Sequence, residues 1–191
     1  MSYPKEWETN FTLRNGVEVF LRPELSGDTE MLWEMFSTLS KESVNNLVPP
    51  FTRDRIESWT SNINYERNLP ILALIQEGKK EHIIGSATLS FYPQKIYSHK
   101  ADLGITVHDE YQNLGLGTAM VNNLLEIAKK KELKKVHLRV SSNNTRAIHV
   151  YEKCGFKMEA RFEKERFQEG KYIDEYQMSI FLWSITLFHK S

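Results

Sequence analysis

The sequence has few of the features that would commit it to a membrane, an oxidising compartment or a nucleic acid. Its only cysteine, Cys154, cannot form an intrachain disulfide, and no cysteine–histidine spacing is typical of a metal site. The longest apolar run, residues 180–188, is far shorter than the roughly 20 residues of a membrane span, and the N-terminus has no apolar signal core. Basic and acidic residues number 25 each, so neither nucleic acid nor an anionic membrane is an expected partner. These absences predict a soluble, cytoplasmic protein without a bound metal.

The length of 191 residues and an apolar content of 40% suit one domain with a substantial core. The sequence contains no internal repeat, low-complexity segment or linker. We expect a lead-in over residues 1–16, one domain over 17–182 and a tail over 183–191. The apolar stretch 180–188 suggests either additional core or a contact between the subunits of a homodimer.

Hydrophobic periodicity predicts strands and helices that alternate along the chain. Strands are expected at residues 17–22, 70–75, 82–91, 102–107, 135–140, 156–167 and 171–182, with another at 11–13 and a bulge at Gly85. Helices are expected after N-caps at Asp28 and Thr52, and over 118–131 and 145–154. Paired asparagines and prolines in residues 40–51 argue against regular structure there. The pattern is that of one α/β domain, a mixed sheet with helices on both faces.

The segment Gln112-Asn113-Leu114-Gly115-Leu116-Gly117 lies between a predicted strand and a predicted helix. Such a turn directs backbone N–H groups and the positive end of a helix dipole at one point, which suits a phosphate or pyrophosphate. A mononucleotide P-loop would need a lysine after Gly117, where Thr118 stands. A dinucleotide fingerprint would need a glycine in place of Met120. Both nucleotide motifs therefore fail.

The remaining pattern, Gln/Arg-x-x-Gly-x-Gly/Ala, resembles the signature of the GNAT superfamily of acyl-CoA-dependent N-acetyltransferases. A second segment, Asn144-Thr145-Arg146-Ala147-Ile148-His149-Val150-Tyr151-Glu152-Lys153-Cys154-Gly155-Phe156, is similar to that family's Asn-x-x-Ala…Tyr-Glu-Lys-x-Gly-Phe segment. The resemblance covers about residues 17–182. It implies a single-domain GNAT-like fold whose mixed, mostly antiparallel sheet is splayed at its central strands.

The resemblance also implies that the cosubstrate is acetyl-CoA. Its pyrophosphate would rest on the backbone amides of Gln112, Asn113, Leu114, Gly115, Leu116, Gly117 and Thr118. Ile105 and Val107 would pair with the pantetheine arm as an added strand would. Asn144 would bond the arm from the other side of the gap, although a helix-capping role alone is an alternative for this residue.

The implied reaction is transfer of the acetyl group to a primary amine by direct attack in a ternary complex. Tyr151 would act as general acid toward the leaving thiolate, or would only pack on the sheet. An alkylamine is neutral to only about one part in 10³ at pH 7, so a base or a desolvating site is needed. Asp102 matches the position of a carboxylate in many relatives, but it is one methylene shorter than glutamate and would need a water relay; a solvated strand residue is its alternative. His108 and Glu110 are weaker candidates.

The acceptor is left open by the sequence. Residues 40–51, 92–100 and 162–172 would surround it, and they mix aromatic side chains with charges of both signs, without an acidic funnel typical of polyamine sites. Small amines, amino acids, a protein N-terminus and a protein lysine all remain candidates, and so does a non-catalytic acyl-CoA sensor. His99, His137 and His149 are too scattered for a metal site, and we expect them at the surface.

Overall fold

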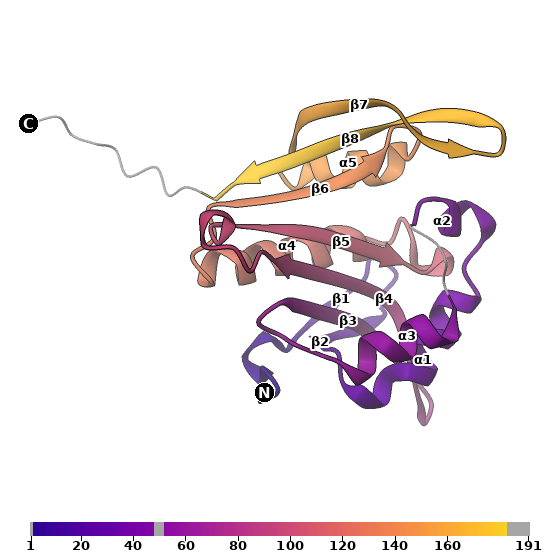
Figure 1. Cartoon of the computed structure of the whole chain (residues 1–191). Coiled ribbons are helices and arrows are strands. Elements are labelled where there is room, and N and C mark those ends of the chain that lie inside the picture. Colours follow the sequence, from indigo (N-terminus) through magenta and orange to yellow (C-terminus); the bar gives the residue numbers. More distant parts are fainter. Residues whose placement is uncertain (1, 48–51, 183–191) are drawn as a thin grey trace, which may run out of the picture.

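A computed structural model describes residues 2–47 and 52–182 (Figure 1). The strands are β1 (Thr9–Thr12), β2 (Glu18–Pro23), β3 (Asn68–Glu77), β4 (Lys80–Phe91), β5 (Lys100–Val107), β6 (Lys135–Ser141), β7 (Lys157–Gln168) and β8 (Lys171–Phe181). The α-helices are α1 (Thr29–Ser37), α2 (Lys41–Asn45), α3 (Arg53–Ser61), α4 (Leu116–Lys130) and α5 (Thr145–Lys153). Short 3₁₀ turns occur at Lys5–Trp7, Ser26–Asp28, Lys95–Tyr97 and Asp109–Tyr111. The expected order of elements is confirmed, and the structure adds the short helix α2.

The strands form one eight-stranded sheet in the order β1-β2-β3-β4-β5-β6-β8-β7. All neighbouring pairs are antiparallel except β5 and β6, which are parallel. Those two strands pair only where residues 100–102 lie beside residues 135–137, and they diverge beyond that point (Figure 1). The mixed, mostly antiparallel sheet splayed at its centre is therefore confirmed.

Helices cover both faces of the sheet, and successive side chains of β3 are therefore buried in two different hydrophobic cores. Ile71 and Ala73 pack into the core that includes α4 and Tyr151 of α5. Leu72 and Leu74 point the other way, into the core formed by α1 and α3. Successive side chains of a strand lie on opposite faces, so a continuous apolar run is what a strand buried on both sides requires.

The expectation that residues 40–51 lack regular structure is wrong for the part that the structure describes. Residues 41–45 form α2, and the Ser40 hydroxyl accepts a hydrogen bond from the Ser43 N–H at 3.2 Å. The Asp109 carboxylate accepts further bonds from the Ser40 N–H at 2.7 Å and the Ser43 hydroxyl at 2.6 Å. Because a helix of five residues is not stable alone, these tertiary contacts explain why the sequence pattern missed it. Residues 48–51 lie outside the described ranges.

Asp28 occupies the N-cap position of α1 as expected, but its side chain does not cap the helix. Its two carboxylate oxygens each accept a hydrogen bond from Arg22, both at 2.7 Å, and one also accepts from the Leu25 N–H. Both members of this ion pair are buried. The N-cap pattern cannot foresee this, since Arg22 lies on a strand before the turn.

Smaller differences concern boundaries. The strand expected at 11–13 is β1. It lies within the expected lead-in and pairs with β2 of the domain. Helix α4 begins at Leu116, inside the glycine turn. A register shift opposite Ala73 and Leu74 confirms the bulge near Gly85. The division into lead-in, domain and tail stays a prediction, and the tail lies outside the described residues. None of the described helices is long and apolar enough to cross a membrane.

Candidate active site

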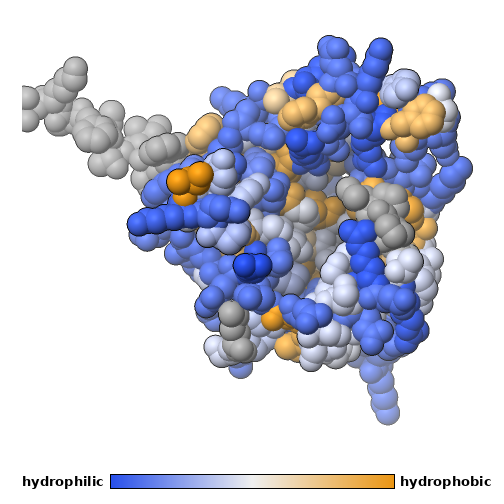
Figure 2. Space-filling view, in the orientation of Figure 1, coloured by the Kyte–Doolittle hydropathy of each residue, from blue (hydrophilic) through white to orange (hydrophobic). Residues whose placement is uncertain are grey.

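A cavity of about 1450 Å³ opens where β5 and β6 diverge. Figure 2 shows a largely hydrophilic surface that is hollowed in this region, with hydrophobic side chains inside the hollow. Most of the residues that the sequence singled out are brought together in its lining: Ile105, Val107, Gln112, Asn113, Gly115, Gly117, Thr118, Asn144 and Tyr151. Leu114, Leu116 and Asp102 are not among the lining residues.

The glycine turn has the backbone geometry of an anion cradle. Asn113 has a φ of 62° and Gly115 a φ of 95°, so two left-handed residues flank Leu114. A left-handed residue between ordinary ones turns neighbouring N–H groups toward one point. Helix α4 begins immediately afterwards, where its first N–H groups have no intrahelical partner and the helix dipole is positive. Gly115 is needed at this position because an L side chain is strained at that φ.

Arg14, which the sequence analysis did not single out, lies beside this turn. Its N–H donates to the Leu114 carbonyl at 3.2 Å, and its Nε lies 3.8 Å from the place that a Cβ at Gly115 would occupy. Arg14 lines the cavity, and its side chain makes no ion pair with a described residue. The β1–β2 hairpin therefore brings a cation to the glycine turn across about 100 residues of chain, a proximity that no local pattern predicts.

The diverging strands expose backbone edges to the cavity. Ile105 and Val107 line it from β5, and Val140 and Ser141 line it from β6. Past residue 102, β5 pairs with β4 on one side and has no strand partner on the other among the residues that the structure describes. An extended molecule that carries amide groups can bond to such an edge as an added strand does.

Tyr151 lies on α5 with its ring tilted against Phe156 at a centroid distance of 5.9 Å. Its relative exposure is 7%, and burial raises the pKa of its phenol above the usual value. Its hydroxyl makes no hydrogen bond to a described residue, although the residue lines the cavity. Tyr151 therefore presents a protonated hydroxyl that is available to a bound molecule.

Asn144 is confirmed as the cap of α5, because its Oδ1 accepts a hydrogen bond from the Ala147 N–H at 3.2 Å. It also lines both the large cavity and an adjoining pocket of about 550 Å³. Its amide nitrogen makes no hydrogen bond to a described residue. Capping and contact with a bound molecule are therefore compatible for this side chain.

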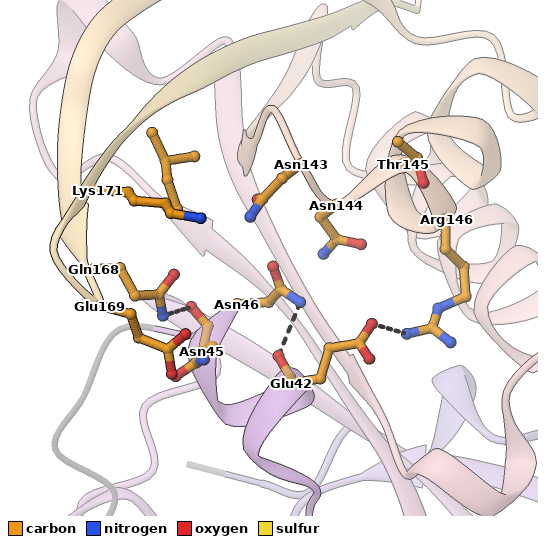
Figure 3. A pocket seen from close by; sticks show the side chains of 11 residues that line it. Glu42, Asn45, Asn46, Asn143, Asn144, Thr145, Arg146, Gln168, Glu169 and Lys171 are labelled. Carbon is orange, nitrogen blue, oxygen red and sulfur yellow. Dashed lines mark hydrogen bonds and ion pairs between the residues drawn. The ribbon is translucent and has the colours of Figure 1, made fainter.

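The adjoining pocket lies where α2, the start of α5 and the β7–β8 hairpin meet (Figure 3). Glu42 and Arg146 form an ion pair across it at 3.6 Å. Arg166 fixes the end of α2 by donating to the carbonyls of Asn45 and Leu47, both at 2.9 Å, and to the Ser141 hydroxyl at 2.6 Å. One guanidinium thus connects three elements around the mouth of the cavity.

Asp102 belongs to a separate cluster at the closed end of β5 and β6. Its carboxylate accepts a hydrogen bond from the Tyr92 hydroxyl at 2.6 Å, and His137 Nε2 lies 3.1 Å from the same hydroxyl. Burial and this carboxylate raise the pKa of Tyr92 to about 12. The surface position expected for His137 is wrong, because it is 7% exposed and burial lowers its pKa.

The candidate bases His108 and Glu110 lie apart from the cavity, whereas His149 lines it. His108 Nε2 lies 3.2 Å from the Thr38 hydroxyl, Glu110 is exposed, and neither lines the cavity. His99 and His149 are exposed, as expected. The described residues contain no group of three or more side chains that could hold a metal ion.

Comparison with known proteins identifies a family by sequence and a shared fold by structure. The family model of the acetyltransferase (GNAT) family matches residues 31–156. The L-amino acid N-acetyltransferase AaaT of Escherichia coli K12 is 31% identical over 98 residues, or 51% of this chain and 60% of that protein. A spermidine N(1)-acetyltransferase of Vibrio cholerae is 34% identical over 86 residues, or 44% of this chain and 50% of that protein. The matches thus span only part of these relatives.

Solved structures share the fold. The GNAT domain of S. lividans PAT has a TM-score of 0.75 at 19% identity, covering 95% of this chain and all of that domain. Spermidine N-acetyltransferase from Vibrio cholerae, in complex with CoA and spermine, has a TM-score of 0.71 at 23% identity, covering 85% of this chain and 95% of that one.

Proposed function

The chain belongs to the acetyltransferase (GNAT) family, and we propose that it transfers the acetyl group of acetyl-CoA to a primary amine in a ternary complex. The observation that carries the proposal is the cavity at the divergence of β5 and β6, which joins the glycine turn, two strand edges and the Tyr151 hydroxyl. The named relatives act on amines: an L-amino acid in one case and spermidine in another. A small amine is therefore the acceptor class that we favour over a protein.

The residues present suit coenzyme A. The N–H groups from Gln112 to Thr118 would hold its pyrophosphate, with the Arg14 guanidinium as a neighbouring cation. The free edge of β5 at Ile105 and Val107 would bond the amides of the pantetheine arm, and the amide nitrogen of Asn144 would face it from the other side.

When bound, acetyl-CoA supplies the thioester carbonyl that an amine attacks. A backbone N–H near Val107, at the free edge of β5, would polarise that carbonyl. Tyr151 would donate to the departing sulfur. Holding the amine and the thioester together in one cavity accounts for a large part of the rate in such reactions.

Asp102 remains our candidate for the base, acting through water. It lies two residues before Gly104, or about 7 Å along the strand, and Gly104 lines the cavity whereas Asp102 does not. The proton that the acceptor ammonium loses, before its neutral amine attacks, would therefore reach the Asp102–Tyr92–His137 cluster by a relay and not by direct contact.

The test is a thiol-release assay with acetyl-CoA against a panel of alkylamines, amino acids and peptides. We expect turnover with small amines. Turnover restricted to peptides would move the assignment to a protein acetyltransferase. Binding of acetyl-CoA without turnover on any amine would contradict catalysis and support a sensor.

A further inference from the structure

Glu24 lies on the floor of the large cavity, at the end remote from the glycine turn. Its N–H donates to the Pro70 carbonyl at 3.0 Å, Pro70 pairs with Thr88, and Thr88 pairs with Gly104. Directly paired residues of neighbouring strands face the same side of a sheet. These four residues therefore form one row from the end of β2 across β3, β4 and β5, and all of them line the cavity.

The pairing of these strands gives the distance between Glu24 and the part of β5 where we propose that acetyl transfer takes place. Three inter-strand steps, or about 14 Å between backbones, separate Glu24 from Gly104. Gly104 lies on the part of β5 that no longer pairs with β6. Glu24 and Gly104 line the same cavity, so an elongated molecule of about this length would reach both ends.

Glu24 is a buried carboxylate without a partner of its own. The residue is 3% exposed, and its carboxylate makes no hydrogen bond or ion pair with a described residue. The neighbouring guanidinium of Arg22 is committed to Asp28 through two bonds of 2.7 Å. The Tyr65 hydroxyl donates to the Glu24 backbone carbonyl and not to its side chain.

The charges around Glu24, the Asp28 carboxylate and the Arg22 guanidinium, favour the binding of one more cation. Burial and the Asp28 carboxylate raise the pKa of Glu24 to about 7, whereas Arg22 opposes them. When Glu24 is ionised, two carboxylates share one guanidinium. A buried charge of this kind is costly unless it is paired, so an arriving ammonium would stabilise the ionised form.

The walls between the two ends suit an aliphatic amine. The hydroxyl-bearing residues Ser86, Thr88 and Ser90 of β4 line the floor. Phe36 and Trp59, which contact each other edge to face at 5.8 Å, line the side. The Arg55 guanidinium already lies 5.6 Å from the centre of the Trp59 ring, so this wall offers apolar contact to methylene groups, while the hydroxyls accept hydrogen bonds from N–H groups.

We propose that Glu24 binds a second protonated nitrogen of the acceptor, so that the preferred acceptors are di- and polyamines. The inference rests on the proposed acetyl transfer and deepens it. An acceptor with a single amine would leave Glu24 unpaired and would lose this contact. The sequence did not suggest this class because the site depends on one carboxylate and not on an acidic cluster.

The experiment compares α,ω-diaminoalkanes of increasing chain length with n-alkylamines of the same lengths in the thiol-release assay. We expect kcat/KM to favour the diamines once the chain spans the cavity. Glu24→Gln should lower kcat/KM for those diamines by about ten- to a hundredfold, the value of a buried charge-assisted contact, and should leave the alkylamines nearly unchanged. Glu57→Gln, an exposed residue of α3 outside the cavity lining, is the matched control.

Two results separate the failure of this inference from failure of the proposed function. Turnover of alkylamines and diamines at equal kcat/KM by the wild-type protein would overturn the role of Glu24 and leave acetyl transfer intact. This comparison needs no variant, so it holds even if Glu24→Gln does not fold. Binding of acetyl-CoA without turnover of any amine would overturn both.

Discussion

Tyr151 combines a nearly complete burial with a hydroxyl that reaches the cavity. Burial raises the pKa of its phenol, well above the value of about 8.5 for a thiol. Full transfer of its proton to a thiolate is therefore uphill. A hydrogen bond donated to the departing sulfur is the role that this environment supports best.

Tyr151→Phe tests that role. We expect kcat to fall by about a hundredfold, the lower end for a positioned proton donor, with little change in the dissociation constant of acetyl-CoA. Steady-state kinetics and calorimetric titration measure the two quantities. Tyr111→Phe is the control, because its hydroxyl bonds to Glu77 at 3.3 Å outside the cavity lining. An unchanged kcat would remove Tyr151 from the mechanism.

The buried Glu24 carboxyl also leads us to predict how the free energy of unfolding changes with pH, independently of any activity. Its pKa is about 7 in the folded protein, against an ordinary value of 4.5, so the folded state keeps the proton to higher pH. Stability is therefore fullest below pH 4.5 and declines as the pH rises to 7, by on the order of 3 kcal/mol for this group. Glu24→Gln should abolish this decline, so the variant should gain stability over the wild type between about pH 5 and pH 8. Urea denaturation at about pH 5 and pH 8 measures it, and an equal decline in both proteins would contradict the assignment.

At the scale of single elements, β5 would carry both the edge that bonds the cofactor and part of the floor beneath the acceptor. Gly104 is exposed on that floor, and nothing lies within 4 Å of the place that its Cβ would take. A side chain there would project into the cavity without a clash in the apo fold.

Gly104→Val should therefore weaken the use of the acceptor amine without lowering the stability of the fold. We expect kcat/KM for the amine to fall by about tenfold or more, since a displacement of about 1 Å in such a site is costly. The melting temperature should stay equal or rise, because valine suits a strand better than glycine. Calorimetry and kinetics give the two values, and Gly104→Ala should be intermediate. A large loss of melting temperature would show that the position is structural.

The elements differ in how well the sequence predicted them. Periodicity and caps predict each main strand and the helices α3, α4 and α5. The reason is that the alternation of buried and exposed residues in these elements can be recognised in consecutive residues of the sequence. Helix α2 does not, since Asp109 and Arg166 hold it from distant segments. The same limit applies to Asp28, whose partner Arg22 turns an apparent cap into a buried ion pair.

At the scale of the whole molecule, the divergence of one parallel pair creates the site. The β5–β6 pairing ends after three residues, and beyond them the two strands diverge. Helix α4 begins at one side of the gap and the β7–β8 hairpin lies at the other (Figure 1). Cofactor and acceptor would therefore approach a single opening from two sides.

The apolar stretch from Ile180 to Phe188 suggests either additional core or the subunit contact of a homodimer. Phe181, its one exposed large hydrophobic among the described residues, is 56% exposed. Residues 183–188 of that stretch lie outside the described ranges. Light scattering at micromolar concentration is the measurement. A dimer mass is expected, and a monomer mass would contradict the prediction, while Phe181→Ser should shift a dimer toward monomer.

The sequence by itself determined the family, the glycine turn and several of the residues that line the cavity, because these depend on consecutive residues with fixed backbone demands. Only the tertiary structure decided that Arg14 lies beside the turn, that Asp102 bonds to Tyr92 away from the cavity, and that Glu24 ends a row leading from the cleft. Each of these depends on strand register across distant segments. Pairing in a sheet, and not spacing along the chain, sets which charges share a cavity.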